Sequence, residues 1–425
     1  MTAPTRPAGA AVHHRAAVAA AAELADTLAA PPPVIDLGGD DPGSRRWRDQ
    51  SLSKGAAGVA ILHAERAHNG DGPQARVHAW LAQATREDLS AGPKAGLWFG
   101  APAVTFSLHT TAAQQHPQAL AQLDEAVTRL VHRRLVAADT RLAACLRPPV
   151  AEYDLVRGLT GLGAYLLHRH PHGTLIRRVL AYLVRLSEPL LIDDEAGPQA
   201  PGWWSPDGPY GGPDPRWPGG HGNFGMAHGI AGPLALLSLA IRHGITVDGH
   251  AAALTRICEW LDQWRVDSPT GSWWPPHIDV SDLHTGPRPA AGPGRPSWCY
   301  GTPGLARALQ LAGIALGDRD RQHAAEQALA ACLADPAQLA QIVDPAICHG
   351  WAGLALTAWH VHADALCPAV GTHLPALLER LVTHARDPLP DDLPGLVDGR
   401  AGIALTLHHL TAGTTGDWTS CLLLD

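Results

Sequence analysis

The feature that most constrains the fold is a short phrase, G-x-x-G followed by an apolar run, which recurs along the chain. Glycines let a backbone turn tightly and approach a neighbouring element, and each apolar run has helical length. Such repetition is typical of architectures built from one repeated helical unit. In the second of the seven phrases, Ala103 replaces the second glycine. The phrases begin at Gly55, Gly100, Gly158, Gly229, Gly301, Gly350 and Gly399.

Segments of a second kind lie between the phrases, with charged residues at three- and four-residue spacing, as in outer-layer helices. The glycine-led helices are nearly uncharged, as in an inner layer. The sequence therefore predicts an all-α protein, an α/α toroid of seven inner and seven outer helices, with an open solenoid as the alternative. We expect residues 1–425 to form one domain, with residues 1–33 as an N-terminal surface helix and proline-rich linker. The amphipathic segments include residues 118–139, 175–191, 251–266 and 321–335.

Closure of the ring would bring the residues before each first glycine to one central region. Several of them carry charge and two are histidines, whereas a purely structural position is more often apolar. The turns are therefore where we expect a site. The seven residues are Lys54, Phe99, Arg157, His228, Tyr300, His349 and Asp398.

Composition excludes several classes of protein. The net charge of -8 and the pI near 6.3 give no basic footprint for nucleic acid. No apolar run is long enough for a membrane span, and the alanine-rich N-terminal segment is too charged for a signal peptide. Seven scattered cysteines do not form a disulfide framework. We expect a cytoplasmic protein that associates with a membrane only through a complex.

Two cysteines, Cys299 and Cys348, stand at the same place in their phrases, two residues before the first glycine, and His349 follows the second of them. Two thiolates and an imidazole satisfy three positions of a tetrahedral zinc ion and leave the fourth open. Thiolate ligands also suit a further sulfur ligand, so the set predicts activation of a substrate thiol. The other cysteines are expected to be buried packing residues.

Two further residues are candidates for proton transfer. His228 stands before Gly229 and could act as acid or base near neutral pH, with a packed core histidine as the alternative. Asp154 lies four residues before Gly158, where it is either part of the site or a helix cap. His221 is a weaker candidate, and the remaining histidines are expected at the surface or in packing.

Two long segments rich in proline, glycine and tryptophan, residues 195–222 and 267–297, interrupt the helical pattern. Loops of this length in a compact domain are usually functional or disordered. We expect them to wall a substrate cleft, with their five tryptophans offering apolar surface to a peptide.

The phrases "NFGMAHGIAGPL", "SWCYGTPG" and "ICHGWAGLALT" resemble, in this order, the lanthionine synthetase C-like family, the cyclases of class I lantibiotics. The resemblance implies a double ring of seven helices each and zinc held by Cys299, Cys348 and His349. It implies His228 and Asp154 as catalytic residues, with Arg295 near the active histidine and Tyr300 in the pocket. Relatives carry a small β-rich extension, which we expect here to be reduced or absent.

The resemblance further implies a substrate, a ribosomal precursor peptide whose serines and threonines have been dehydrated. A peptide cysteine would add to dehydroalanine or dehydrobutyrine and close a thioether ring. A cognate dehydratase and an exporter at the membrane are the implied partners. Two alternatives stay open: a zinc enzyme that adds glutathione or another thiol, and a non-catalytic zinc-bearing scaffold closed by a fourth ligand such as His228 or His221. Protein prenyltransferases are disfavoured because they supply Asp, Cys and His to zinc.

Overall fold

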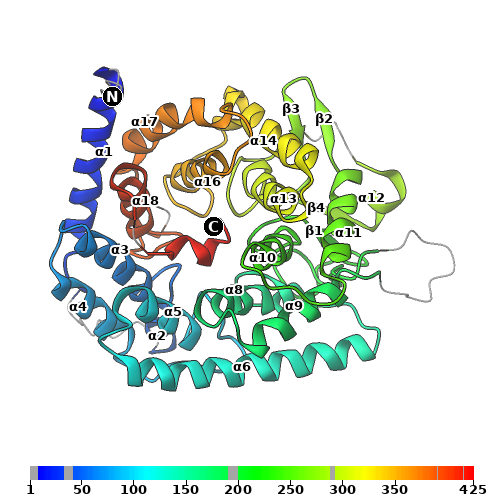
Figure 1. Ribbon diagram of the computed structural model, residues 1–425, viewed down its shortest axis with the longest axis horizontal. Coiled ribbons are helices and arrows are strands. Elements are labelled where there is room, and N and C mark those ends of the chain that lie inside the picture. Colours follow the sequence, from blue (N-terminus) through cyan, green and yellow to red (C-terminus); the bar gives the residue numbers. More distant parts are fainter. Residues whose placement is uncertain (1–7, 33–41, 190–199, 288–291, 390, 415) are drawn as a thin grey trace.

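Each glycine-led phrase begins a buried helix, so the sequence repeat becomes a structural repeat. The computed structural model describes residues 8–32, 42–189, 200–287, 292–389, 391–414 and 416–425. Each of these helices contacts the next, and α18 contacts α3, so the contacts run round a closed circuit (Figure 1). The seven are α3 (Ala56–His68), α5 (Ala101–Ala112), α8 (Leu159–Arg169), α10 (Ala231–Arg242), α13 (Thr302–Leu316), α16 (Trp351–Ala363) and α18 (Arg400–Ala412).

A second set of helices covers the outside of this circuit (Figure 1). The amphipathic segments predicted from charge spacing are helical, and each packs against a glycine-led helix. The N-terminal segment contains a helix that does more than cover the surface: α1 buries Ala17, Ala21 and Leu24 and packs against α17 and α18. Pro33, in the predicted linker, lies outside the described residues. The outer helices are α1 (Ala8–Thr27), α4 (Gln74–Ala84), α6 (Pro117–Ala143), α9 (Thr174–Leu186), α11 (His250–Gln263), α14 (Arg319–Ala334) and α17 (Leu374–His384).

Short elements fill the connections. Among the described residues, four three-residue strands form two antiparallel pairs, β1 with β4 and β2 with β3, within or at the edges of the two long segments. These strands are too short to leave a periodic signal in the sequence. The short elements are α2 (Pro42–Asp49), α7 (Val150–Tyr153), β1 (His221–Asn223), β2 (Val266–Ser268), β3 (Gly271–Trp273), β4 (His277–Asp279), α12 (Val280–Thr285), α15 (Pro336–Leu339), η2 (Val370–His373) and η3 (Trp418–Leu422).

The second glycine of each phrase is fixed by a close approach of backbone. A Cβ added at Gly402 would lie 1.7 Å from the carbonyl oxygen of Leu396, six residues earlier, and one at Gly353 would lie 1.8 Å from that of Ile347. No side chain fits at such distances, so the turns that carry this second glycine can fold this closely over their helices only with glycine there. The same six-residue relation holds at Gly58, Gly161, Gly232 and Gly304.

Backbone hydrogen bonds join the turns to one another around the circuit. The Cys299 amide donates to the Cys348 carbonyl at 3.2 Å, and the Cys348 amide donates to the Val397 carbonyl at 3.0 Å. Within the described ranges, six of the seven steps between consecutive turns carry such a bond. All the turns therefore lie at the same end of the circuit. The other four bonds run from Leu52 to Trp98, Leu155 to Ala227, Met226 to Cys299 and Val397 to Ser53.

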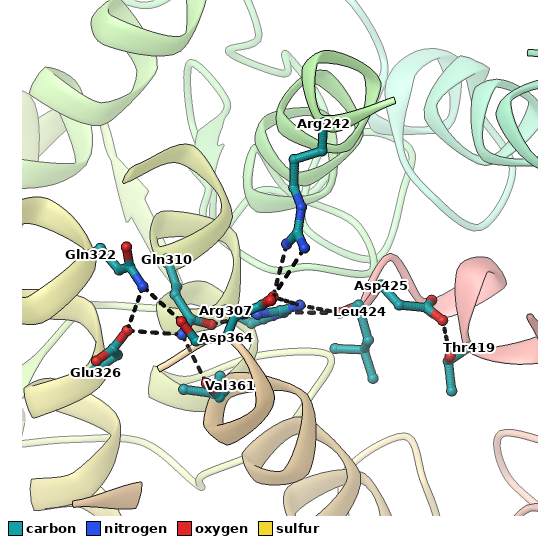
Figure 2. Close-up of polar contacts among 10 residues, drawn as sticks. All are labelled: Arg242, Arg307, Gln310, Gln322, Glu326, Val361, Asp364, Thr419, Leu424 and Asp425. Carbon is teal, nitrogen blue, oxygen red and sulfur yellow. Dashed lines mark hydrogen bonds and ion pairs between the residues drawn. The ribbon is translucent and has the colours of Figure 1, made fainter. Parts of the chain in front are cut away.

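Residues 418–425 lie at the centre of the circuit (Figure 1). The Trp298 indole donates to the Leu422 carbonyl at 3.1 Å. The guanidinium of Arg307, which is 1% exposed, donates to the Leu424 carbonyl and to Asp364 (Figure 2). One cluster of buried apolar residues runs through the fold from α1 to this segment. No helix in the described ranges is long and apolar enough to cross a membrane.

We predict that Gly402→Ala destabilises the protein by about 3 kcal/mol, because the new methyl group must displace the Leu396 carbonyl. Urea unfolding measures the change. Gly92→Ala is the control, since a Cβ there meets nothing within 4 Å and should shift stability by less than about 0.5 kcal/mol. Equal unfolding midpoints for the two variants would contradict the close-approach argument.

Candidate active site

The turns surround two adjoining hollows with volumes of about 770 and 610 Å³. Six of the seven residues that precede a first glycine line the larger one, and the seventh, His349, lies beside it in a cluster with Cys299 and Cys348. The predicted convergence of the turns is therefore confirmed. The hollows meet at residues that line both: Ala151, Arg157, His228, Cys299 and Tyr300.

A group of three side chains at this junction could hold a metal ion. The ligand atoms of Cys299, Cys348 and His349 all lie within 4.8 Å of one another. Cys299 comes from the turn before α13, the other two come from the turn before α16, and the bond between the two cysteine backbones fixes the spacing. Two sulfurs and one imidazole nitrogen are a donor set for a tetrahedral ion. The residues present thus fit the metal that the resemblance implies.

Of the three side chains, only Cys299 is already in the deprotonated form that binds a metal. A hydrogen bond from the Cys348 thiol lowers the pKa of Cys299 to about 5. The Asp344 carboxylate, with help from Cys299, raises the pKa of His349 to about 9. The same contact with Cys299 raises the pKa of Cys348. One thiolate beside an imidazolium is the result, and a bound cation would replace the remaining protons.

Asp344 is a site residue that the sequence analysis missed. Its Oδ2 lies 3.1 Å from His349 Nε2, and its Oδ1 accepts a hydrogen bond from the Ala346 amide at 2.9 Å. The carboxylate is buried, and it leaves Nδ1 of His349 as the nitrogen available to a metal. Carboxylates in this position orient ligand histidines and raise their basicity. The available signal was an acidic residue in the turn that carries Cys348 and His349.

His228 and Asp154 form a second pair at the junction. His228 Nδ1 lies 2.7 Å from Asp154 Oδ2, and Asp154 Oδ1 accepts hydrogen bonds from the amides of Arg157 and Gly158. Asp154 is 1% exposed. Its Oδ1 caps the turn and its Oδ2 contacts His228, so one carboxylate makes the contacts of both alternatives that the sequence left open. The pairing sets the tautomer with the proton on Nδ1 and leaves Nε2 of His228 free of Asp154.

Tyr300 and Arg295 line the smaller hollow together with this pair. The Tyr300 ring stacks at 6.4 Å from the His228 ring, and the Tyr300 hydroxyl accepts a hydrogen bond from Asn223 at 3.1 Å. Burial raises the pKa of Tyr300, so its hydroxyl stays neutral. Arg295 lines the smaller hollow together with Asp154. Asn223 is another residue that the sequence analysis did not identify.

A histidine pair lies beside Tyr300. The rings of His221 and His277 are 5.5 Å apart, and the His277 ring is 5.1 Å from that of Tyr300. His221 Nδ1 is bonded to the Asp207 carbonyl, and His221 is not part of the Cys299 group. His277 lines the smaller hollow, although its sequence context suggested only packing. Among the described residues, neither His221 nor His228 closes the metal group as a fourth ligand.

The two long segments wall the smaller hollow, but not with their tryptophans. Trp203, Trp204, Trp273 and Trp274 are at most 4% exposed, so the prediction of tryptophan contact surface was wrong for them. Their rings anchor the segments to the helical body, for example Trp274 through a hydrogen bond to the Leu261 carbonyl. The wall residues include Asp207, Pro209, Tyr210, His277 and Arg295. Residues 195–199 and 288–291 of these segments lie outside the described ranges.

The fold and site define a class of protein: a circuit of helices whose turns bring together a Cys, Cys, His group that could hold a metal and a histidine bonded to a buried carboxylate. Comparison with known proteins agrees. The profile of the family described as "Lanthionine synthetase C-like protein" matches residues 46–423, and the chain belongs to this family.

Relatives of known name support the assignment. The "Nisin biosynthesis protein NisC" of Lactococcus lactis subsp. lactis is 25% identical over 219 residues, which are 49% of this chain and 48% of that protein. The aligned part thus spans about half of the relative's length. A solved structure of "Nisin cyclase" matches with a TM-score of 0.74 and 18% identity over 89% of this chain and 93% of that chain. At this identity the structural likeness shows the shared helical fold.

We predict that Asp344→Asn weakens metal binding by about 10- to 100-fold, because the neutral amide no longer raises the basicity of His349. Competition with a chromophoric zinc chelator measures the affinity. Asp398→Asn is the control: Asp398 lines the larger hollow and accepts a hydrogen bond from Ser53, outside the metal-ligating group. Unchanged zinc affinity in Asp344→Asn would show that Asp344 does not orient His349 for metal binding.

A second prediction concerns pH. Burial, followed by the nearby His221 and His228, lowers the pKa of His277 to about 3. The unfolded chain therefore binds a proton below about pH 6.5 that the folded protein does not, so stability falls as the pH falls toward 3. We expect His277→Phe to reduce the slope of unfolding free energy by about 1.4 kcal/mol per pH unit between about pH 6 and pH 4.5. Urea unfolding at several pH values tests this against His172→Phe, an exposed position, and equal slopes in both variants would contradict it.

Proposed function

We propose that the protein is a zinc-dependent cyclase that forms lanthionine and methyllanthionine rings in a dehydrated ribosomal precursor peptide. The observation that carries the proposal is the juxtaposition of two groups at one junction. The Cys299, Cys348 and His349 group and the Asp154-held His228 border the same hollows. Membership of the lanthionine synthetase C-like family supports it.

Zinc is the metal that suits the first group. Thiolate sulfur and imidazole nitrogen are its usual protein ligands, and three protein ligands with a fourth position for substrate are typical of catalytic zinc. When bound, zinc would supply a positive charge that keeps a substrate thiol deprotonated at neutral pH. Cys299, Cys348 and His349 would hold the ion, and Asp344 would orient His349.

The remaining residues would manage the proton. In the addition, the cysteine sulfur forms a bond to the β-carbon of dehydroalanine or dehydrobutyrine, the carbon–carbon π bond breaks, and a proton is delivered to the α-carbon. His228 would exchange that proton through Nε2, while Asp154 holds Nδ1 and stabilises the imidazolium form. Arg295 would face the negative charge that develops on the substrate carbonyl oxygen, and Tyr300 would stack on the His228 ring.

The hollows suit a peptide substrate. The combined volume of the two hollows is larger than a single side chain needs, and their walls include the aromatic residues Trp47, Phe99 and Tyr210. Lys54 and Arg157, among other cations, line the larger hollow, where Asp398 is the acidic residue. This positive lining would attract backbone carbonyls and acidic side chains of a peptide, although the whole chain is acidic.

The setting follows from the same proposal. We place residues 1–425 in a single domain of the α/α toroid class, supported by the closed circuit of helix contacts and the single apolar cluster. We further propose a cytoplasmic enzyme that receives its substrate from a dehydratase and passes the product to an exporter at the membrane. Seven free cysteines fit a reducing compartment.

We predict that Cys348→Ala loses about one zinc ion per chain together with cyclisation, whereas His228→Ala keeps its zinc and slows cyclisation by at least about 100-fold. The first variant removes a ligand and the second removes only the acid–base group. Elemental analysis counts the zinc. Ring closure leaves the peptide mass unchanged, so alkylation of the remaining peptide thiols followed by mass spectrometry counts the rings.

Cys145→Ser is the matched control, because Cys145 is exposed and lies outside the metal group; it should keep both zinc and activity. Full activity in His228→Ala would reject the acid–base role. Addition of glutathione mass to the dehydrated peptide, without loss of peptide thiols, would favour an intermolecular thiol transferase. Zinc without reaction on any dehydrated peptide would indicate a scaffold.

A further inference from the structure

A second group of metal-ligating side chains lies away from the turns. The ligand atoms of His323, Glu326 and Cys367 lie within 4.8 Å of one another. His323 and Glu326 are three residues apart on the first turns of α14, and therefore share a face of that helix. Cys367 follows the end of α16, whereas Cys348 and His349 precede its start. The thirteen residues of α16 separate the two groups by about 20 Å.

Glu326 is a buried carboxylate whose position is fixed by its neighbours. Its Oε1 accepts hydrogen bonds from the amides of Gln310 and Gln322, and its Oε2 accepts one from the Leu366 backbone. A carboxylate has about four acceptor positions, so one remains on Oε2. The residue is 0% exposed, and water cannot fill that position freely.

A chain of hydrogen bonds connects Glu326 to Arg307. Figure 2 shows Arg307 donating to the Gln310 carbonyl oxygen and the Gln310 amide donating to Glu326. This relay connects the carboxylate to a guanidinium that Asp364 also contacts. The relay fixes the position of the carboxylate without occupying its last acceptor position.

The other two ligands are also placed for binding. The side-chain amide of Gln327 lies 2.9 Å from His323 Nε2. Turning this amide over by 180° places its oxygen against Nε2–H, and Nδ1 of His323 is then available to a metal, as in ligand histidines that donate from their other ring nitrogen. Cys367 is half-buried and directly follows Leu366, whose amide is bonded to Glu326. Two of the three ligands are thus held by partners of their own.

We propose that His323, Glu326 and Cys367 bind a second divalent transition metal ion, zinc by donor preference. Sulfur, nitrogen and oxygen donors are all accepted by zinc, with a water molecule as the fourth ligand. One thiolate and one carboxylate balance the charge of the ion, which lowers the cost of binding it in a half-buried place. The ion would tie α14 to the segment that follows α16.

The test measures zinc in the full chain after loading with Zn²⁺ alone and removal of unbound ion. The double variant Cys299→Ala, Cys348→Ala lacks two ligands of the first group and should retain about one zinc per chain. Adding Cys367→Ser should reduce that to near none. Loading the double variant with Co²⁺ should give thiolate-to-cobalt absorption, which Cys367→Ser should abolish and Cys145→Ser should leave unchanged.

The outcomes separate this site from the proposed cyclase centre. A double variant that binds no zinc and shows no cobalt–thiolate absorption overturns the second site and leaves the first intact. Wild-type zinc that is lost in Cys367→Ser and kept in the double variant supports the second site and rejects the first. Because Cys367 is half-exposed, Cys367→Ser should fold; unchanged cyclisation and circular dichroism would confirm that zinc loss is not unfolding.

Discussion

The structure depends on a close contact between backbone and backbone: in six of the seven phrases, a carbonyl passes over the second glycine. This contact sets how far a turn can fold onto its helix, and the turn position sets which amide reaches the next turn. The bond from Cys299 to Cys348 is one step of that chain, and the ligand spacing follows from it. The position of the candidate metal-binding group is therefore set by main-chain geometry, which the glycines make possible. In the second phrase Ala103 stands where the other six have their second glycine, and the helix α5 still forms there.

The two histidines at the junction are held in the same way. Asp154 and Asp344 each use Oδ1 to accept backbone amides of their own turn and Oδ2 to contact a histidine. In both cases the carboxylate is buried, so its charge is directed to one imidazole. The chemistry of the two histidines differs because of what else they meet: His349 lies among thiols, and His228 lies against the Tyr300 ring.

The helical circuit and the convergence of its turns could be predicted because the spacing of the glycines and the length of the apolar run are both visible within each phrase. Cys299 and Cys348 were found through their equivalent positions, which is also a local property. Asp344 and Asn223 were not found, because an acidic or amide side chain in a turn has many ordinary roles until its partner is known. The prediction for the buried tryptophans was wrong for a related reason: the sequence of a loop does not show which of its side chains pack against the core. His323, Glu326 and Cys367 come together only through packing of α14 against the segment after α16, and no periodicity reveals that contact.

The contact between α3 and α18 has a consequence for biosynthesis. A ring cannot be closed until its last member has left the ribosome, and here the first and last glycine-led helices are more than three hundred residues apart. Contacts of such sequence separation form slowly, and the apolar flanks of α1 and α3 stay uncovered meanwhile. The nascent chain is therefore open to aggregation for most of its translation, and the junction of the two hollows is one of the last parts of the molecule to form.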